Sequence, residues 1–424
     1  MNLPSIAILH YSASPVVGGV EAVIDAHVRL LIAAGYPVTV VAGRGAADAL
    51  PAGCNFVEIA AMDTQHPAIL AASAQLDEGT VPAEFAALTG QLRAALEPVL
   101  DDFDLVIVHN VLFKHFNLPL TAALFELMDA QSLTRTIAWG HDFTWTSPNS
   151  RHKVRGRYPW DLLRTFRPNI TYVAVSAQRQ QELAGLFGIA PERIDVVYNG
   201  VDPHDLLGLS AEGSALIRRL GVYDAGLVLL MPVRVTKAKN IEFALAVVAA
   251  LKRLEQKPLL LLTGPPDPHD AQSMAYFHEL QRLRAELDVE AEMRFVYESG
   301  TDPDAGYLIP PTVVGDLYRT ADALLMPSHR EGFGMPVLEA ALTGVPVAAS
   351  KAVPAAIELA GDEALLFAPE EAPDALARRL VAWLAANPVA RLRRHVRQRY
   401  TWEAIFARDI EPLLTPTDRK EPVS

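Results

Sequence analysis

Short apolar runs alternate with helical patterns along most of this chain, and the alternation occurs in two series. The runs of the first series are residues 5–11, 37–41, 104–110, 134–139, 172–176 and 194–202. Those of the second series are residues 227–231, 259–264, 294–297, 323–326, 346–350 and 365–367. Strands that alternate with helices form parallel sheets covered by helices on both faces. The two series therefore predict an α/β protein with two doubly wound, Rossmann-like domains.

The bulk properties fit this division. The chain has 424 residues, which is too long for one ordinary core, and we expect domains over residues 1–205 and 206–399. The net charge of −13 argues against nucleic acid as a partner. Cys54 is the one cysteine, so no intrachain disulfide or cysteine zinc site is possible. With neither a secretory signal nor a long apolar span, a cytoplasmic protein is expected.

The stretch from Pro327 to Glu339 contains several candidate ligand-binding residues close together. It follows the apolar run 323–326 and leads into a helical pattern, so it is predicted to lie at the carboxyl end of a strand, where open α/β sheets bind ligands. Gly332 and Gly334 let a ligand approach the backbone, and the helix start behind them is a ready anion site. Glu331 and Glu339 bracket this loop. Carboxylates that accept from sugar and ribose hydroxyls, together with N–H groups for phosphate, suit a sugar nucleotide.

Glu-x7-Glu around Gly-Phe-Gly, with Pro-Ser before it and Met-Pro within it, resembles the signature of the family 4 glycosyltransferases. These are retaining enzymes of the two-domain GT-B fold. The alternative is a glycine-rich turn with two solvated glutamates. The resemblance implies that Glu331 is catalytic, as a transient nucleophile or an orienting group. It implies donor contacts from Gly332, Phe333, Gly334, Met335 and Glu339.

A pair of cations follows the first apolar run of the second series. Arg234 and Lys239 lie five apart at a predicted strand-to-helix turn, where two cations suit the charge of a leaving diphosphate. The family has an Arg-x4-Lys pair at this point, which implies that both residues bind the donor. Pro232 stands where the family usually has glycine, and this departure could shift the loop.

The first series contributes three further features. The Gly18-Gly19 pair ends the first predicted strand–helix loop, and the family's corresponding loop approaches the donor phosphates or the acceptor. His141 follows a predicted strand in Gly-His-Asp, and the resemblance implies that it hydrogen-bonds the donor sugar or its leaving group, against the alternative of a histidine satisfied by turn backbone. Asn110 and Lys114, which follow another strand, are candidates for acceptor contact.

Residues 151–167 hold six arginines and lysines with one acid, in a chain that is otherwise acidic. Three interpretations stay open: a solvated face, a pocket for an anionic acceptor with Arg155 in it, or a patch that contacts acidic lipid headgroups at the inner face of a membrane. Asp302-Pro303-Asp304 superficially resembles a metal-binding DxD, but it lacks a flanking strand pattern and GT-B enzymes generally need no metal. We expect no metal site.

The resemblance implies transfer of a hexose from a nucleotide diphosphate sugar, UDP- or GDP-linked, to an acceptor hydroxyl that is unknown and either anionic or lipid-linked. The sugar nucleotide is a substrate, so no cofactor is expected. In the GT-B fold the two domains face a cleft, and a last helix, here 400–416, crosses back to the first domain, followed by a disordered tail, 417–424. The alternatives are a GT-B epimerase or phosphorylase, or a regulator that binds sugar nucleotides without catalysis. The donor base, the acceptor and the oligomeric state are not readable from the sequence.

Overall fold

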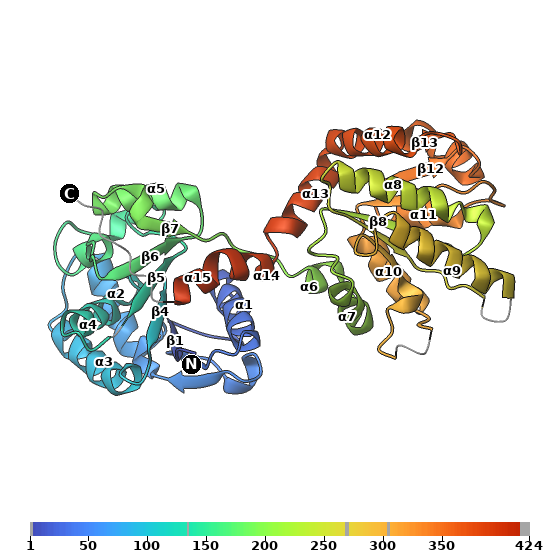
Figure 1. Ribbon diagram of the computed structural model, residues 1–424. Coiled ribbons are helices and arrows are strands. Elements are labelled where there is room, and N and C mark those ends of the chain that lie inside the picture. Colours follow the sequence, from blue (N-terminus) through green and yellow to red (C-terminus); the bar gives the residue numbers. More distant parts are fainter. Residues whose placement is uncertain (1–2, 134, 268–270, 303–305, 416–424) are drawn as a thin grey trace, which may run out of the picture. The chain divides into compact units, whose positions relative to one another are not determined.

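The chain forms two α/β units in the computed structural model, which describes residues 3–133, 135–267, 271–302 and 306–415 (Figure 1). Unit 1 comprises the residues up to Gly200 together with those from Trp402 onward, and unit 2 comprises Val201–Thr401. The sequence placed these boundaries at 205 and 399. Thr134, Pro303, Asp304, Pro416 and the tail 417–424, which entered the sequence predictions, lie outside the described residues.

Unit 1 is built on a seven-stranded parallel sheet with the order β3-β2-β1-β4-β5-β6-β7. Its strands are β1 (Ile6–His10), β2 (Val38–Ala42), β3 (Asn55–Glu58), β4 (Leu105–His109), β5 (Thr136–Gly140), β6 (Ile170–Ala174) and β7 (Ile194–Val196). Its helices are α1 (Gly19–Ala33), α2 (Pro67–Asp77), α3 (Phe85–Leu100), α4 (Leu118–Asp129), α5 (Ala177–Phe187), α14 (Trp402–Ile405) and α15 (Glu411–Leu414).

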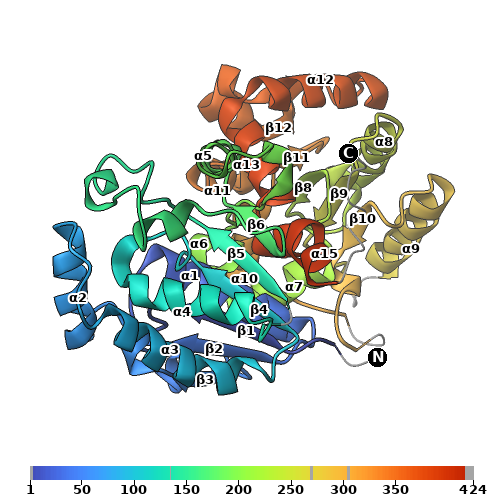
Figure 2. The same ribbon diagram turned by 90° about the vertical axis from the view of Figure 1, so that its left-hand side faces the viewer.

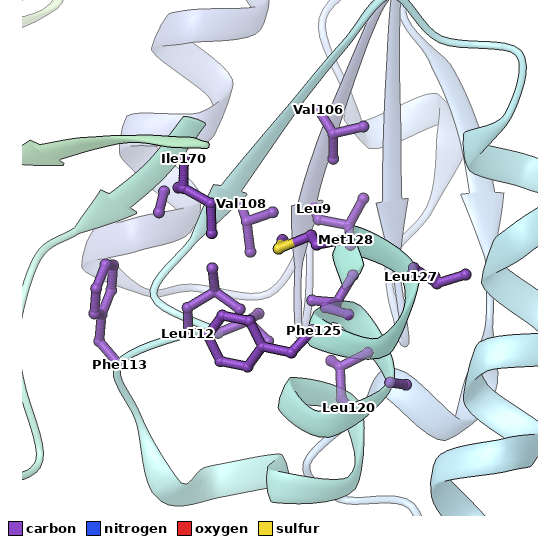
Figure 3. Close-up of a cluster of buried hydrophobic side chains, with 14 of the residues drawn as sticks. Leu9, Val106, Val108, Leu112, Phe113, Leu120, Phe125, Leu127, Met128 and Ile170 are labelled. Atoms are coloured by element: carbon purple, nitrogen blue, oxygen red, sulfur yellow. The ribbon is translucent and has the colours of Figure 1, made fainter. Parts of the chain in front are cut away.

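Helices cover both faces of this sheet, as the apolar runs predicted. Figure 1 shows α3 and α4 on one side of the strands and α1 with α14 and α15 on the other. In Figure 3 the side chains of Leu120, Leu127 and Met128 from α4 gather beside Leu9 and Val108 from the central strands. Burial of this core fixes the position of the carboxyl ends of β1 and β4, because strands buried on both faces have no freedom to slip.

Unit 2 has a six-stranded parallel sheet with the order β10-β9-β8-β11-β12-β13. The strands are β8 (Leu227–Met231), β9 (Pro258–Leu262), β10 (Met293–Phe295), β11 (Ala323–Met326), β12 (Val347–Ser350) and β13 (Leu365–Phe367). The helices are α6 (Pro203–Leu207), α7 (Ala211–Arg219), α8 (Ile241–Arg253), α9 (Ala271–Glu286), α10 (Pro311–Thr320), α11 (Met335–Leu342), α12 (Pro373–Ala386) and α13 (Pro388–Arg399). Figure 2 gives a second view of the same elements.

Two apolar cores sandwich the unit 2 sheet. One core combines α8, α9 and α12 with Leu229 and Met231 of β8, and the other combines α7, α10 and α11 with Val228 and Leu230. Alternate residues of β8 therefore face opposite cores, which is the pattern of a strand buried on both faces. Val201 and Thr401, the two end residues of this unit, form a parallel β-bridge, and the Val201 N–H donates to the Tyr400 carbonyl at 2.8 Å.

Three features of local structure were not predicted. The alanine-rich region 62–100 contains two helices, α2 and α3, and Gly79 adopts φ +92° just after α2, a conformation that glycine reaches without strain. β3 was not predicted, because this edge strand is short and its four side chains are exposed or half-buried, so it lacks an apolar run. The final helix is also interrupted, since a π-helical turn over Phe406–Ile410 separates α14 from α15.

Candidate functional site

The loops that carry the unit 2 signature meet at one point of the sheet. The strand order reverses between β8 and β11, so the loops after these two strands diverge to opposite faces and leave a crevice, which is where open α/β sheets bind ligands. Two hydrogen bonds join the loops: the Asn240 side-chain amide donates to the Pro327 carbonyl at 3.1 Å, and the His329 N–H donates to the Ala238 carbonyl at 2.9 Å. Asn240 has φ +53°, which its short polar side chain tolerates.

Lys239 and Glu331, predicted separately, are in direct contact at this switch point. The Lys239 Nζ donates to Oε1 of Glu331 at 2.6 Å, and the same oxygen accepts from the Ser328 hydroxyl at 2.8 Å. The Glu331 side chain is only 10% exposed and that of Lys239 21% exposed, so each charge compensates the other in a partly dry site. Sequence reasoning gave Ser328 no role, although its place in the Pro-Ser pair before the glycines was the available signal.

Arg234 lies in the same loop but is not part of this contact. Its side chain is exposed, and it forms no hydrogen bond or ion pair with the part of the chain that the structure describes. The structure thus separates the predicted cation pair into one engaged and one open cation. An open guanidinium at a strand end is able to bind a phosphate in a bidentate manner.

The glycine loop has the backbone that the motif predicted. Gly334 precedes α11 with φ +105°, and a Cβ there would lie 2.5 Å from Cγ1 of Val353, so only glycine fits. The Phe333 carbonyl accepts from the Ala355 N–H at 2.8 Å, which fixes the loop. At Gly332 a Cβ would meet no atom within 4 Å, so this glycine leaves open space. The Phe333 and Met335 side chains are 40% and 55% exposed.

Glu339 is held by a buried phenol rather than by a cation. The Tyr318 hydroxyl donates to its Oε2 at 2.7 Å, and Tyr318 is nearly fully buried. Burial raises the pKa of Tyr318 well above its usual range, and the neighbouring carboxylate raises it further, so the phenol stays a donor. Glu339 itself is exposed on α11 and keeps a free oxygen for a ligand. Sequence reasoning missed Tyr318, because nothing in the chain pairs residues 318 and 339 before folding.

The unit 1 switch point lies between β1 and β4, and it gathers histidines. His10 ends β1, His109 ends β4 and His141 follows β5. The His109 Nδ1 lies 3.0 Å from Nε2 of His141, and the His10 Nδ1 lies 2.9 Å from the His109 carbonyl oxygen. His27 of α1 packs its ring against His109 at 5.4 Å between centroids. The sequence identified only His141 of these four.

Burial makes these imidazoles poor bases. It lowers the pKa of His141 to about 4, with a further contribution from the nearby His10, and lowers that of His27 to about 3. Burial likewise lowers the pKa of His10, although the His109 carbonyl and Glu21 oppose it, and holds that of His109 well below its usual range. At neutral pH these imidazoles are therefore uncharged, and His10, His109 and His141 are connected through hydrogen bonds, whereas His27 contributes packing only.

The two acceptor candidates near His141 use their polar atoms inside unit 1. Asn110 has φ +58°, and its Oδ1 accepts from the His141 N–H at 2.9 Å. Lys114 is buried and donates to Oδ2 of Asp142 at 2.6 Å. Burial raises the pKa of the Asp142 carboxyl, but the Lys114 hydrogen bond and charge outweigh it and the net shift is downward. Both side chains thus shape the loop that carries His141.

The glycine pair before α1 makes room for a carboxylate. A Cβ on Gly18 would lie 2.1 Å from Oε2 of Glu21, whereas one on Gly19 would meet nothing within 4 Å. Glu21 turns back over the loop, where its Oε1 accepts from the Ser12 hydroxyl at 2.6 Å. The first glycine is therefore required for local packing, and the second leaves the helix start open.

The cations of the basic stretch 151–167 largely bind the protein's own groups. Lys153 donates to Asp77 at 2.6 Å, while Arg155 donates to the Asp77 carbonyl at 3.2 Å and Arg157 to the Gly79 carbonyl at 2.8 Å. Cations at the end of α2 satisfy its last carbonyls and interact well with the helix dipole. This contact is a structural role that none of the three interpretations of the stretch included.

Two wider features concern the described residues as a whole. No group of three or more His, Cys, Asp or Glu side chains in the described ranges could hold a metal ion. None of the helices that the structure describes is both long and apolar enough to cross a bilayer.

Two doubly wound α/β units in one chain, with ligand-type loops at both switch points, define the GT-B class. The family models called Glycosyltransferase Family 4 and Glycosyl transferases group 1 match residues 17–205 and 215–400. The chain therefore belongs to the group 1, family 4 glycosyltransferases.

Several known proteins are similar to part or nearly all of the chain. A D-inositol 3-phosphate glycosyltransferase of Thermobispora bispora is 32% identical over 180 residues, which is 42% of this chain and 39% of the relative. A protein of the same name from Saccharomonospora viridis is 30% identical over 234 residues, 52% of this chain and 50% of its own. The chain spans two fifths to half the length of these relatives. A solved Anabaena structure, HepE with UDP and glucose, is 19% identical, covers 97% of this chain and 99% of its own, and has a TM-score of 0.35.

Proposed function

We propose that the protein transfers a hexose from a nucleotide diphosphate sugar to an acceptor hydroxyl, with retention at the anomeric carbon. Family membership supports the transfer of a sugar. The observation that carries the proposal is the unit 2 switch point, where the Lys239–Glu331 pair lies in a loop beside the open Arg234 and before a glycine-lined helix start.

Each part of this site has a task in the proposed reaction. Arg234 and Lys239 neutralise the charge that develops on the diphosphate as the glycosidic bond breaks. Glu331 accepts from hydroxyls of the sugar, and Glu339 accepts from those of the ribose. The leaving phosphate takes the acceptor's proton during front-face attack, so the protein acts by positioning and charge stabilisation more than as a general base.

The acceptor is proposed by class only. Relatives of the chain are named as glycosyltransferases that act on D-inositol 3-phosphate, an anionic polyol. A small phosphorylated polyol is therefore the first acceptor to try. Lys114 and Arg155 already bind groups of unit 1, so they are weak candidates for its phosphate.

The test is a thermal-shift panel of UDP-, GDP- and ADP-sugars, followed by an assay for nucleoside diphosphate release with candidate acceptors. A ligand at a hundred times its Kd stabilises the folded state by about 2.7 kcal/mol, which such a panel detects easily. A transferase releases the diphosphate, whereas a regulator that only binds the sugar nucleotide stabilises without release. An NMR spectrum of the product gives the anomeric configuration, and inversion would contradict the retaining part of the proposal.

Metal independence is a separate part of the proposal. Because Arg234 and Lys239 supply positive charge at the diphosphate, turnover should continue in excess EDTA. Complete loss on chelation, with recovery on addition of Mg²⁺ or Mn²⁺, would show that the cations do not suffice.

A further inference from the structure

The His109 ring is held rigidly behind His141. His109 is fully buried at the end of β4, and its ring stacks on Trp139 with centroids 5.6 Å apart and an interplanar angle of 25°. Its backbone carbonyl is engaged by His10, and its Nδ1 lies 3.0 Å from Nε2 of His141. Because packing fixes the ring, the His109 Nδ1 points toward His141, which is its one hydrogen-bond partner among the described residues.

Counting protons restricts this contact to two arrangements. Both rings are neutral, so one nitrogen donates and the other accepts. If His141 donated, the His109 proton would have to sit on Nε2, which is buried and has no partner among the described residues. A buried N–H without an acceptor is costly, and the neighbouring His27 and Trp139 rings each already bury one, so a third in the same cluster is disfavoured. The arrangement in which His109 donates from Nδ1 leaves only a lone pair buried.

The other nitrogen of His141 faces a different environment. Its Nδ1 has no hydrogen-bond partner in the described part of the chain, and unlike Nε2 of His109 it is not sealed from solvent. The His141 backbone N–H is tied to Asn110, which holds the residue in place without using the ring. The free nitrogen is therefore the one that can meet a ligand.

We infer that His109 is a positioning residue that donates its Nδ1 proton to Nε2 of His141 and so keeps His141 in the Nδ1–H tautomer, with a hydrogen-bond donor turned to an oxygen of the bound substrate. This inference rests on the proposed function for the identity of the substrate. A second group that fixes the tautomer of a working histidine is a recurrent arrangement. With the opposite tautomer, His141 would present a lone pair, which can accept from a sugar hydroxyl but cannot donate to a phosphate or sugar oxygen.

Three variants separate this role from simple packing. His109→Leu removes the donor. His109→Asn keeps one, because an amide nitrogen can take the place of Nδ1. His27→Leu is the matched control, since His27 is an equally buried ring that contacts His109 and has no hydrogen-bond partner among the described residues. We expect His109→Leu to lower kcat by about 10- to 100-fold with little change in nucleoside diphosphate affinity. His109→Asn should recover most of the rate, and His27→Leu should lose little.

The decisive readout is the ¹⁵N spectrum of the histidine rings, with the His141 signals assigned by their loss in His141→Gln. Wild type and His109→Asn should show a protonated Nδ1 and a bare Nε2 at His141, and His109→Leu a mixture of tautomers. A wild-type His141 protonated at Nε2 would overturn the inference, even if His109→Leu failed to fold. The spectrum needs no substrate, so a protein that released no nucleoside diphosphate would contradict the proposed function while leaving this result to stand or fall separately.

Discussion

The two switch points of this molecule, between β1 and β4 in unit 1 and between β8 and β11 in unit 2, differ in the charge of the side chains that they carry. In unit 1, histidines at the ends of β1, β4 and β5 are buried, neutral and joined by hydrogen bonds. In unit 2, the loops after β8 and β11 carry full charges, with Lys239 paired to Glu331 and Arg234 open to solvent. Burial lowers the pKa of these imidazoles even at His10, whose Nε2 lies 3.9 Å from Oε1 of Glu21, whereas an ammonium and a carboxylate in direct contact stay charged.

Under the proposed function, this difference suits the two units to different tasks. A diphosphate needs permanent positive charge, which only the unit 2 switch point supplies in a usable position among the residues described. The donor and acceptor nitrogens of a neutral imidazole can hydrogen-bond to hydroxyl groups, which carry no net charge. Sugar nucleotides contain both kinds of group, so the contrast is itself an argument for such a donor. Variants that exchange or remove the charges test it most directly.

The largest effect is expected from Arg234→Ala. The open guanidinium is the charge that a diphosphate can gain without breaking an existing ion pair, so its loss should lower kcat/KM by two to three decades, roughly 3–4 kcal/mol. Lys237→Ala is the matched control, because Lys237 is an exposed cation of the same loop that lies over the Tyr276 ring. Steady-state kinetics of both variants test whether Arg234 binds the diphosphate. Activity of Arg234→Ala within threefold of wild type would end the assignment.

The two glutamates should give the next largest effects, of different kinds. Glu331→Gln should lower kcat far more than nucleotide affinity, because contacts to the sugar tighten as charge develops at the anomeric carbon. It also releases Lys239 from its ion pair, so binding of free nucleoside diphosphate should be kept or strengthened. Glu339→Gln should mainly raise the donor KM by one to two decades, about 1.5–3 kcal/mol, because ribose contacts are uniform through the reaction.

Calorimetry with free nucleoside diphosphate separates the two glutamates, since this ligand has ribose but no sugar. Tyr318→Phe serves as an intermediate case, because it leaves Glu339 in place without its 2.7 Å hydrogen bond. Weak binding to Glu331→Gln with normal binding to Glu339→Gln would mean that the two roles are reversed.

Acid should destabilise the protein through its buried histidines. The folded-state pKa values of His27 and His141 are about 3 and 4, below the ordinary value of 6.5, so the unfolded chain binds more protons between these limits. The free energy of unfolding should therefore fall as pH drops below about 6.5, by up to about 1.4 kcal/mol per pH unit for each such histidine. Urea unfolding at pH 7 and pH 5 measures the slope. His27→Leu should flatten it, and replacement of the exposed His152 is the control; an equal slope in all three would contradict this account.

The smallest effect is expected at Arg155, and it concerns stability. Its guanidinium donates to the Asp77 carbonyl at the end of α2, so Arg155→Ala should lower the free energy of unfolding by about 1–2 kcal/mol. Thermal unfolding of Arg155→Ala beside Arg151→Ala measures this difference, because the Arg151 side chain is exposed and has no side-chain partner among the residues that the structure describes. A raised acceptor KM with unchanged stability would instead return Arg155 to the acceptor site.

The sequence allowed the prediction of much of this architecture, for a physical reason. Central parallel strands are buried on both faces, so each appears as a continuous apolar run such as Leu227–Met231, and the polar residues just after such runs lie at the ligand edge. Arg234, Lys239, Glu331 and His141 were predicted as site residues from their place after such runs together with the family resemblance. β3 escaped because an exposed edge strand has no such run.

The remainder could not be predicted because it depends on contacts between distant residues. Tyr318 and Glu339 lie on different helices, and His109 becomes the neighbour of His141 only when β4 and β5 pair. Arg155 resembled a free cation in a basic stretch, and only its contact with α2 revealed its partner carbonyl. Local sequence indicates which side chains have the chemistry, whereas the fold determines which of them are already occupied.

The bridge between Val201 and Thr401 has a consequence for how such a chain can be rebuilt. Because the first and last residues of unit 2 lie side by side, this unit is an insertion with adjacent ends, the kind of segment that tolerates transplantation. Residues 201–401 could be exchanged for the equivalent segment of another glycosyltransferase through two neighbouring junctions. Under the proposed function, donor preference would move with residues 201–401, while α14 and the rest of unit 1 stayed with the host.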